Sequence, residues 1–534
     1  MNIEHITGYA SKHLGPENET FAYGTAGFRM LASKLDPVVF RVGILAGLRS
    51  KALGGKTIGV MITASHNPPK DNGIKIVDPF GEMLEQSWEA ISTKLANSHD
   101  SESLISTIKE IVESQKIDWS APSNVVVARD SRESGPKLLA STIDGLKAIG
   151  ASFKDFGQLT TPQLHYLTRC FNDSSFGKPD EEGYYEKLIL SYSKIMELWG
   201  VTDDISITVD AANGIGADQI LKLQKYFEQH VKFTLVNGSS DVPSALNSDC
   251  GADFVKTNQK LPSGIPDFEP LKLYSSFDGD ADRVVFYYLN KEGTFRLLDG
   301  DKIATLLASF ISSLLSKLDG KSFKLGIVQT AYANGSSSNY ITNVLKLPLG
   351  VTATGVKHLH HKAQSYDIGV YFEANGHGTV LFSDNFVEAL EAQDFTPGTE
   401  QYKAASTLRL LVDLINQTVG DSIADLLAVL VALRLGDSKT PEEWDSNYTD
   451  LPNRLLKALV KDRNQFKTTD AERKLVEPVG LQSEIDEIVA EYPGGRSFVR
   501  ASGTEDAVRI YAEANTIEDT NELASRVSKL LEKY

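Results

Sequence analysis

The sequence predicts an α/β protein of several domains, and three observations support this. Short β-branched runs alternate with helical patterns, and each run leads into a loop that contains Gly or Asp. The chain has 534 residues, which is enough for roughly three or four domains with their own cores. It contains no low-complexity tract and no short-period repeat. We therefore expect three similar α/β domains with mixed sheets, followed by a smaller α+β domain.

Four short runs are the expected strands of the α/β domains. They span residues 57–62, 125–128, 205–209 and 326–328. In such sheets, ligand groups come from the loops at the carboxyl ends of strands. The loop after the third run contains Gly214 and Gly216, but Gln219 stands where a dinucleotide-binding fingerprint needs its third glycine. We interpret these glycines as packing residues in a strand-to-helix turn.

Polar, turn-rich stretches mark the expected domain boundaries. They lie at residues 172–182, 291–293 and 437–441. The third follows a long helical pattern over residues 400–435, and the last domain ends in an amphipathic helical pattern over residues 517–531. We expect four domains, at residues 1–180, 181–292, 293–438 and 439–534.

The composition narrows the class of partner and compartment. The formal net charge is −17, so neither nucleic acid nor a membrane is expected as a partner, although a local basic pocket can still bind an anionic substrate. The longest apolar stretch, residues 426–433, is too short to span a bilayer, and the first residues lack the features of a signal peptide. Cys170 and Cys250 could form one disulfide, but so few thiols in a long chain favour a cytoplasmic protein.

The motif Thr-Ala-Ser-His-Asn-Pro at residues 63–68 is the first that carries chemistry. Pro68 and Pro69 exclude a helix interior and a central strand. Ser65 therefore lies on a turn at a strand end, where chemistry is usually placed. The alternative is an ordinary Ser/Asn turn that caps the next element.

A second motif is the acidic loop Asp-Gly-Asp-Ala-Asp-Arg. The carboxylates of Asp278, Asp280 and Asp282 can converge on one hard cation, because the small residues between them let the backbone curl. An EF-hand is excluded, since Arg283 and Leu289 stand where that loop needs Gly and Glu. Open ligand positions suit Mg²⁺ bound together with a phosphate oxygen. A solvated acidic loop, or a simple pair of Asp282 with Arg283, is the alternative.

A third motif, Arg-Ala-Ser-Gly-Thr-Glu, starts at Arg500 after a strand-like run over residues 497–499. Its Ser, Gly and Thr offer hydroxyls and backbone N–H groups. The guanidinium groups of Arg500 and Arg509 can bind phosphate oxygens in bidentate fashion. A capped turn beside a surface arginine is the alternative.

A fourth motif, Glu-Ala-Asn-Gly-His-Gly, starts at Glu373 after the apolar run over residues 368–372. Polar residues at every second position can line one wall of a pocket, and a carboxylate beside an amide suits sugar hydroxyls and an N-acyl group. By itself this signal is weak. The nearby His358, His360 and His361 have no cysteine close to them, so we interpret them as part of a solvated loop rather than a zinc site.

Together the four motifs resemble the α-D-phosphohexomutase superfamily. The segment Gly-Thr-Ala-Gly-Phe-Arg that ends at Arg29 adds a fifth matching element. Within the superfamily the chain is similar to the phosphoacetylglucosamine mutases, because it carries Asn375 where glucose and mannose mutases typically have serine, and because Thr354 starts the segment Thr-Gly-Val-Lys-His-Leu-His. The resemblance implies four domains around a central cleft. It also implies an isomerase of N-acetylglucosamine phosphates, with a cytoplasmic place in UDP-N-acetylglucosamine biosynthesis.

The resemblance also implies roles for single residues. Ser65 would be a phosphoserine, and Asp278, Asp280 and Asp282 would hold one Mg²⁺ together with an oxygen of that phosphoserine. The residues implied for the sugar are Glu373, Ala374, Asn375 and His377. The residues implied for the phosphate that is not transferred are Arg500, Ala501, Ser502, Gly503, Thr504 and Arg509. The candidates for the general acid/base are His66, Lys70 and Arg29, and the sequence does not rank them.

In the implied reaction, phospho-Ser65 phosphorylates the free hydroxyl of N-acetylglucosamine 6-phosphate, and the resulting 1,6-bisphosphate turns around before it returns the other phosphate. The last domain should close like a lid, hinged within residues 437–444. We expect a phosphosugar as the small-molecule partner and a monomer or weak oligomer. A glucose or mannose phosphomutase is one alternative, and a catalytically silent phosphosugar-binding protein is another.

Overall fold

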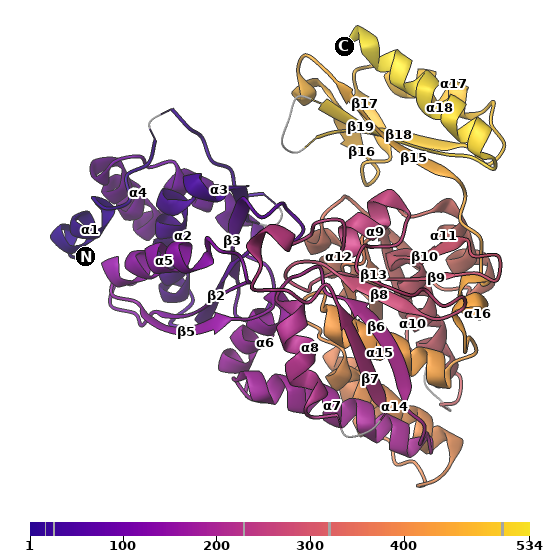
Figure 1. The fold of residues 1–534 in the computed structure, drawn as a ribbon. Helices are drawn as coiled ribbons and strands as arrows, with labels where there is room; N and C mark the ends of the chain where they lie inside the picture. The colour runs from indigo at the N-terminus through magenta and orange to yellow at the C-terminus, as the bar shows by residue number, and fades with distance from the viewer. Residues whose placement is uncertain (17, 25–26, 228–229, 319–321, 503–506) are drawn as a thin grey trace. The chain divides into compact units, whose positions relative to one another are not determined.

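A computed structural model describes residues 1–16, 18–24, 27–227, 230–318, 322–502 and 507–534. These residues form two compact units, which are Met1–Leu297 with Arg409–Val431, and Leu298–Leu408 with Ala432–Tyr534. Strands and helices alternate along the chain in Figure 1. The predicted α/β fold class is confirmed.

The first unit begins with a five-stranded mixed sheet in the order β1-β3-β2-β4-β5. β2, β4 and β5 run parallel, and β3 pairs antiparallel with β1 and β2. The strands are β1 (Phe28–Leu31), β2 (Thr57–Ile62), β3 (Asp71–Val77), β4 (Asn124–Arg129) and β5 (Ser152–Gln158). The helices are α1 (Ile3–Ala10), α2 (Asp36–Ala52), α3 (Gln86–Ala96), α4 (Ser101–Ser114), α5 (Gly135–Ala148) and α6 (Thr161–Asn172). α2 and α5 pack closely because Gly145 leaves room for the Phe40 carbonyl oxygen, 2.0 Å from where a Cβ would lie.

A second mixed sheet follows in the order β10-β9-β8-β6-β7. β6 runs parallel to β7 and β8, whereas β8 and β9 are antiparallel. The strands are β6 (Ile205–Asp210), β7 (Val231–Val236), β8 (Tyr274–Phe277), β9 (Val284–Leu289) and β10 (Phe295–Leu298). The helices are α7 (Glu181–Leu198), α8 (Gly216–Gln224) and α9 (Ala252–Asn258). The acidic loop joins β8 to β9.

The second unit contains a four-stranded sheet in the order β12-β11-β13-β14. β11 runs parallel to β12 and β13, and β14 pairs antiparallel with β13. The strands are β11 (Leu325–Thr330), β12 (Leu349–Thr352), β13 (Ile368–Phe372) and β14 (Gly378–Phe382). The helices are α10 (Gly300–Leu315), α11 (Gly335–Asn339), α12 (Val356–Ala363) and α13 (Asp384–Glu391).

The helical pattern over residues 400–435 forms two helices instead of the single one expected. They are α14 (Glu400–Leu414) and α15 (Ser422–Leu435). Asn416 Oδ1 accepts a hydrogen bond from the Thr418 N–H at 3.1 Å, and Asp421 Oδ1 accepts one from the Ile423 N–H at 3.1 Å. These side chains accept hydrogen bonds from backbone N–H groups between the two helices. They therefore favour the end of α14 and the start of α15.

The C-terminal part is α+β, as predicted. Its antiparallel sheet has the order β15-β19-β18, beside a two-stranded hairpin of β16 and β17. The strands are β15 (Asn453–Leu459), β16 (Lys467–Thr469), β17 (Lys474–Glu477), β18 (Arg496–Ala501) and β19 (Ala507–Glu513). The helices are α16 (Pro441–Asp445), α17 (Leu481–Val489) and α18 (Ile517–Leu530). α18 corresponds to the predicted amphipathic helix, with Leu523 and Val527 in the core.

The predicted hinge segment contains helix α16, which is firmly attached within the second unit. Trp444 is buried, and its indole N–H donates to the Lys302 carbonyl at 3.0 Å. The Lys302 ammonium donates to the Asp445 carbonyl at 2.8 Å. The lid movement stays a prediction, and this attachment favours a pivot beyond Asp445.

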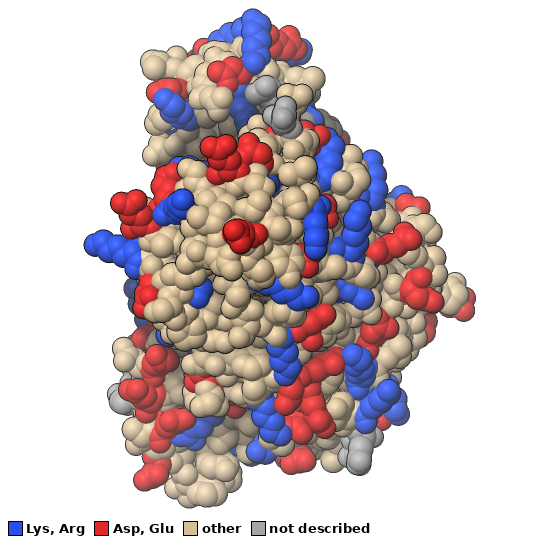
Figure 2. All heavy atoms as spheres, turned by 90° about the vertical axis from the view of Figure 1, so that its left-hand side faces the viewer, with Lys and Arg blue, Asp and Glu red and all other residues tan. Residues whose placement is uncertain are grey.

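The surface carries charges of both signs. On the face shown in Figure 2, acidic and basic side chains are interspersed. Within the described ranges, no helix is both long enough and apolar enough to cross a bilayer.

Candidate active site

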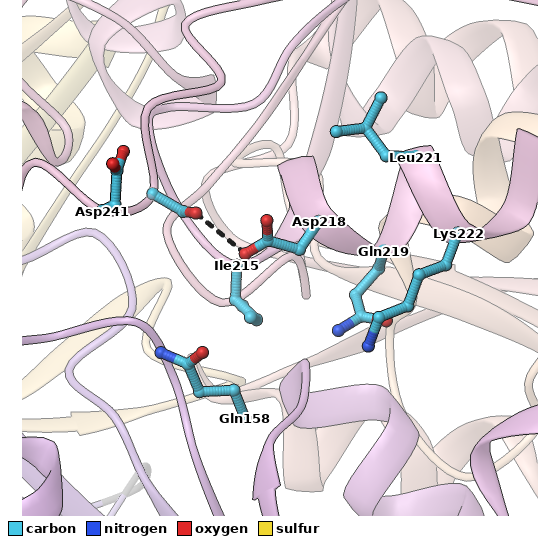
Figure 3. A pocket seen from close by; sticks show the side chains of 8 residues that line it. Gln158, Ile215, Asp218, Gln219, Leu221, Lys222 and Asp241 are labelled. Atoms are coloured by element: carbon cyan, nitrogen blue, oxygen red, sulfur yellow. Dashed lines mark hydrogen bonds between the residues drawn. The ribbon is translucent and has the colours of Figure 1, made fainter.

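A polar hollow of about 460 Å³ beside α8 contains none of the predicted site residues (Figure 3). Ser240 Oγ donates to Asp218 Oδ2 there at 2.8 Å. The residues that line it are Gln158, Ile215, Asp218, Gln219, Leu221, Lys222, Ser240 and Asp241. The predicted residues must therefore be located from their own geometry.

Ser65 lies on a buried turn directly after β2. Its backbone is left-handed, with a φ of 51°, and its side chain is shielded from solvent. The Ser65 N–H donates to Thr63 Oγ1 at 3.0 Å, and the Thr63 hydroxyl donates to Asp130 Oδ2 at 2.7 Å. A non-glycine residue keeps such a backbone only where its surroundings hold it, and this is common at functional sites.

Arg132 anchors the Ser65 turn and was not among the predicted site residues. Its side chain is buried and pairs with Asp130 at 3.1 Å. Its guanidinium also donates, at 2.8 to 2.9 Å, to the carbonyl oxygens of Ser65, Asn67, Pro68 and Asp71. The Arg-Asp-Ser-Arg loop after a strand was visible in the sequence, but its contacts depend on the fold.

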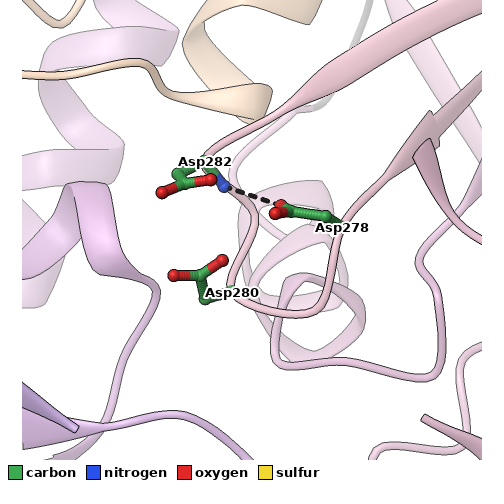
Figure 4. A group of neighbouring side chains, drawn as sticks. All are labelled: Asp278, Asp280 and Asp282. Atoms are coloured by element: carbon green, nitrogen blue, oxygen red, sulfur yellow. Dashed lines mark hydrogen bonds between the residues drawn. The ribbon is translucent and has the colours of Figure 1, made fainter. Parts of the chain in front are cut away.

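The acidic loop between β8 and β9 brings three buried carboxylates together. Oxygen atoms of Asp278, Asp280 and Asp282 lie within 4.8 Å of one another. Figure 4 shows these side chains around a shared space. Asp278 Oδ1 accepts hydrogen bonds from the backbone N–H groups of Asp282 and Arg283 at 3.0 and 3.2 Å. The Arg283 side chain is 3.9 Å from Asp282, so a tight pair does not replace the cluster.

The Ser65 turn and the acidic loop meet directly. Ser65 Oγ donates to Asp278 Oδ2 at 2.6 Å. Glycine is required at position 279, because a Cβ there would lie 2.5 Å from the Ser65 carbonyl oxygen. The loop is backed by Gly214, whose Cβ would lie 2.4 Å from the Gly279 carbonyl oxygen, and by a 3.2 Å hydrogen bond from the Ile215 N–H to that oxygen. Gly214 is thus a packing glycine, as interpreted from the sequence.

The acidic loop has the properties of a cation site. Burial, followed by the neighbouring carboxylates of Asp282 and Asp280, raises the pKa of Asp278 well above its usual range. Within the part of the chain that the structure describes, Asp280 Oδ1 has no hydrogen-bond partner. Mutually repelling buried carboxylates with an unused acceptor oxygen fit a hard divalent cation such as Mg²⁺.

Two cationic side chains from the first sheet lie near the aspartates. Lys75 on β3 is 3.5 Å from both Asp280 and Asp282. Burial lowers the pKa of Arg29 on β1, while the charge of Asp280 acts in the opposite direction. Lys75 was missed, and its only sequence signal is a lysine between isoleucines in a strand that is otherwise apolar there.

The other two acid/base candidates differ in position. His66 Nδ1 lies 3.4 Å from Ser65 Oγ. Burial, together with the nearby guanidinium groups of Arg283 and Arg29, lowers the pKa of His66 to about 3. The side chain of Lys70 is solvent-exposed, so the structure does not place it in the buried turn.

The sugar motif forms the turn between β13 and β14 in the second unit. The Glu373 N–H donates to the His377 carbonyl, and the Gly376 N–H donates to the Glu373 carbonyl, both at 2.9 Å. Asn375 Oδ1 accepts from the His377 N–H at 3.0 Å, and its amide donates to Glu373 Oε2 at 3.3 Å. Glu373, Ala374 and Asn375 are half-buried and His377 is buried. All four predicted sugar residues therefore lie on one turn.

The phosphate motif lies at the junction of β18 and β19. In the strand register, Arg500 on β18 lies directly opposite Arg509 on β19, and Arg509 lies directly opposite Lys457 on β15. Directly paired residues share one face of a sheet, and like charges there repel one another. Three cations in a row therefore favour an anion at this face. Lys457 was missed, because only the strand register places it beside the arginines.

The remaining phosphate residues are described in part. Ala501 ends β18, and the Ser502 N–H donates to the Ala507 carbonyl at 2.8 Å. Gly503 and Thr504 lie outside the described residues. Arg500 Nε donates to the Tyr332 hydroxyl at 2.8 Å, which orients the guanidinium.

The three clustered histidines lie on helix α12 and not in the loop that was expected. Leu359 and Ala363 lie one turn apart and are both buried, which gives this segment an apolar helix face. His360 Nδ1 lies 3.0 Å from the Tyr371 hydroxyl.

Family models match most of the chain. "Phosphoacetylglucosamine mutase AMG1, domain III" matches residues 299–437, and "Phosphoacetylglucosamine mutase AMG1, domain II" matches residues 177–285. Phosphoglucomutase/phosphomannomutase models match in two further regions. The α/β/α domain I model matches residues 50–102 and 96–176, and the C-terminal domain model matches residues 455–530.

Whole-chain comparisons give the same family. A phosphoacetylglucosamine mutase from Candida albicans is 55% identical, and the alignment covers 99% of this chain and 100% of the relative. A crystal structure of N-acetylglucosamine-phosphate mutase in the substrate complex has 55% identity and a TM-score of 0.95, covering 99% of this chain and 100% of that one. The Aspergillus fumigatus N-acetylphosphoglucosamine mutase in complex with GlcNAc-6P and magnesium has 47% identity and a TM-score of 0.93, covering 99% and 98%.

Proposed function

This chain belongs to the phosphoacetylglucosamine mutases, and on that basis we propose that it interconverts N-acetylglucosamine 6-phosphate and N-acetylglucosamine 1-phosphate. The observation that carries the proposal is the 2.6 Å hydrogen bond from Ser65 Oγ to Asp278 Oδ2. It places a strand-end hydroxyl at the edge of a candidate cation site. The complex of a relative with GlcNAc-6P and magnesium supports the same substrate and metal.

We propose Ser65 as the phosphoryl carrier. In the first half of the reaction, the bond between phosphorus and Ser65 Oγ breaks and a bond to the free sugar hydroxyl forms. The sugar hydroxyl proton passes to a general base, and the departing Ser65 Oγ takes up a proton; in the second half Ser65 Oγ gives up its proton and the departing sugar oxygen takes one up. The 1,6-bisphosphate then turns around, and Ser65 Oγ attacks the other phosphoryl group, which restores the phosphoserine and releases the isomer. Such a transfer depends mainly on positioning and on neutralising charge.

Asp278, Asp280 and Asp282 would hold Mg²⁺, whose charge, when bound, stabilises the oxygens of the transferring phosphoryl group. Lys75 and Arg29 add fixed positive charge beside the same aspartates.

We assign the general base to His66, whose Nδ1 lies 3.4 Å from Ser65 Oγ. Its depressed pKa of about 3 makes it a weak base when Ser65 is unmodified. A phosphate dianion on Ser65 would raise this pKa, because a nearby negative charge favours the imidazolium.

We propose that the second unit supplies substrate recognition. Glu373, Asn375 and His377 would bind the sugar, and the row Arg500, Arg509 and Lys457, called here the phosphate row, would bind the phosphate that is not transferred. Ser502, with Gly503 and Thr504, would complete that anion site. Following the family, the product would enter UDP-N-acetylglucosamine biosynthesis in the cytoplasm.

The experiment that tests this function is the substitution Ser65→Ala. Turnover of N-acetylglucosamine 6-phosphate should collapse, while phosphosugar binding measured by isothermal titration persists, because the binding residues are intact. Peptide mapping of the wild-type protein should find one phosphate on the peptide that contains Ser65. Ser87→Ala, at an exposed serine on α3, is the control and should retain turnover. Near-normal turnover in Ser65→Ala would reject the mechanism.

A further inference from the structure

The carboxylate of Glu472 lies beside the phosphate row. Such a position is unexpected, because a negative charge there repels a bound anion. Glu472 Oε1 lies 3.7 Å from Arg500 Nη1. Both side chains are about one-fifth exposed, at 21% for Glu472 and 22% for Arg500. A phosphate bound to this guanidinium would therefore meet a negative charge at the same group. Like charges at such a distance weaken each other's binding, and partial burial limits the screening by salt.

Glu472 is fixed in this place by its other oxygen. Oε2 accepts hydrogen bonds from the Thr354 N–H at 2.9 Å and from the Thr354 hydroxyl at 2.6 Å. Thr354 directly precedes Gly355, the N-cap residue of α12, so the carboxylate is held by a segment outside its own hairpin. It cannot withdraw from Arg500 without losing these two bonds.

The backbone of the hairpin tip also fixes Glu472. Asp470, Ala471 and Glu472 join β16 to β17, and all three have left-handed backbones, with φ of 52°, 55° and 66°. This region of backbone conformation is unfavourable for a non-glycine residue, because its Cβ lies too close to the following carbonyl oxygen. The turn is closed by Arg473, whose guanidinium donates to the Asp470 carboxylate at 2.6 Å. Three consecutive strained residues persist only where their placement is held by surrounding contacts, and such positions cluster at ligand-binding sites.

We propose that Glu472 is a positioning residue that limits the affinity of Arg500 for phosphate, so that a bound bisphosphate can release one end and turn around. This role rests on the mutase function proposed above. Binding that holds every bound state more tightly does not raise turnover. A mutase that must release the same phosphate within each cycle is slowed by an arginine that holds it too firmly.

Glu472→Gln tests this role because it removes the charge while keeping an oxygen for Thr354. Glu477→Gln on the same hairpin is the matched control. It removes the same charge from a carboxylate that pairs instead with Lys467 at 3.0 Å. The probe is inorganic phosphate, titrated calorimetrically into the protein in EDTA, and Arg500→Ala identifies the signal that reports on Arg500. Unfolding midpoints of all variants check that they are folded.

We expect Glu472→Gln to bind inorganic phosphate about two- to fivefold more tightly than wild type, the effect of one partly exposed charge pair. Both KM for N-acetylglucosamine 6-phosphate and kcat should fall, whereas Glu477→Gln should change neither. Unchanged or weaker phosphate binding in Glu472→Gln would overturn the proposal, and so would tighter binding with kcat unchanged. An inactive wild-type protein would instead reject the mutase function, and the phosphate titration would still support or overturn the effect of Glu472 on Arg500.

Discussion

The hydroxyl of Ser65 donates to a carboxylate that burial and two neighbouring aspartates make reluctant to ionise. A phosphoryl group on that oxygen would add negative charge to a cluster that already contains Asp278, Asp280 and Asp282. The nearby cations Lys75, Arg29 and Arg283 carry three positive charges, which do not balance three carboxylates and a phosphate dianion. At the residue scale, we therefore expect that phosphorylation of Ser65, as proposed, requires a divalent cation at this cluster.

Asn375 is the residue on which sugar specificity depends in our proposal. Its side chain bonds the His377 N–H and Glu373 Oε2, so it shapes the turn and also offers an amide to the substrate. Asn375→Ser should lower kcat/KM for N-acetylglucosamine 6-phosphate about tenfold relative to glucose 6-phosphate, because a lost polar contact in a binding site costs roughly 1–2 kcal/mol.

The measurement is the ratio of kcat/KM for the two substrates in both proteins. Asn343→Ser, at an exposed asparagine just after α11, is the control and should leave this ratio unchanged. If Asn375→Ser also leaves the ratio unchanged, the specificity lies elsewhere.

At the element scale, the site is formed by loops whose backbones touch. The Ser65 turn is held by Arg132, by the acidic loop and by Asn247, which lies between β7 and α9 and whose amide donates to the Ser65 carbonyl at 3.0 Å. The Thr161 hydroxyl, at the start of α6, donates to Asp280 Oδ2 at 2.6 Å. The spacing between the serine and the aspartates therefore depends on the positions of several separate segments of the chain.

Gly279→Ala tests this spacing. The new Cβ would lie 2.5 Å from the Ser65 carbonyl oxygen, so one of the two loops must move. A displacement of about 1 Å at reacting atoms can cost roughly a hundredfold in rate. We expect turnover to fall by about that factor, with a loss of about 1–3 kcal/mol in the free energy of unfolding.

Steady-state kinetics and denaturant unfolding check this prediction. Gly8→Ala is the control, because nothing lies within 4 Å of its Cβ and it is inside helix α1. That change should leave turnover intact and stabilise the protein by about 0.5–1 kcal/mol. Equal turnover in wild type and Gly279→Ala would show that the close approach is not needed.

At the scale of the whole molecule, the cation site should contribute to stability. Buried carboxylates that repel one another destabilise the metal-free fold, and a cation that binds only the folded state stabilises it by about 2.7 kcal/mol at 100 times Kd. Adding Mg²⁺ to EDTA-treated protein should therefore raise the midpoint of the first unit's unfolding. Asp280→Asn should reduce this shift and weaken the Mg²⁺ dependence of the rate.

Differential scanning calorimetry with and without Mg²⁺ measures the shift. Glu110→Gln is the control, because it removes an exposed carboxylate that is paired with Lys94. Mg²⁺ should raise its unfolding midpoint by the same amount as that of the wild type. An equal shift in Asp280→Asn would remove Asp280 from the metal site.

Local sequence was sufficient for the fold class, for several strands and for the motifs. Alternation of β-branched runs with helical patterns predicted the α/β class, and the end of the run over residues 57–62 predicted the place of Ser65. The expected loop at His358 and the single helix over residues 400–435 were wrong. In the first, packing of Leu359 and Ala363 stabilises a helix, and in the second, the side chains of Asn416 and Asp421 interrupt one.

The sequence by itself determined the family and the fold class and predicted the residue types of the candidate site, because these follow from short-range patterns and motif order. Only the tertiary structure revealed Arg132, Lys75, Lys457 and Glu472. Their roles depend on partners far away in the chain: carbonyls of the Ser65 turn, the acidic loop, a neighbouring strand and the Thr354 backbone. A charged residue has the same local pattern whether it faces solvent or a buried ion, and the difference arises only when folding sets which charges share a space.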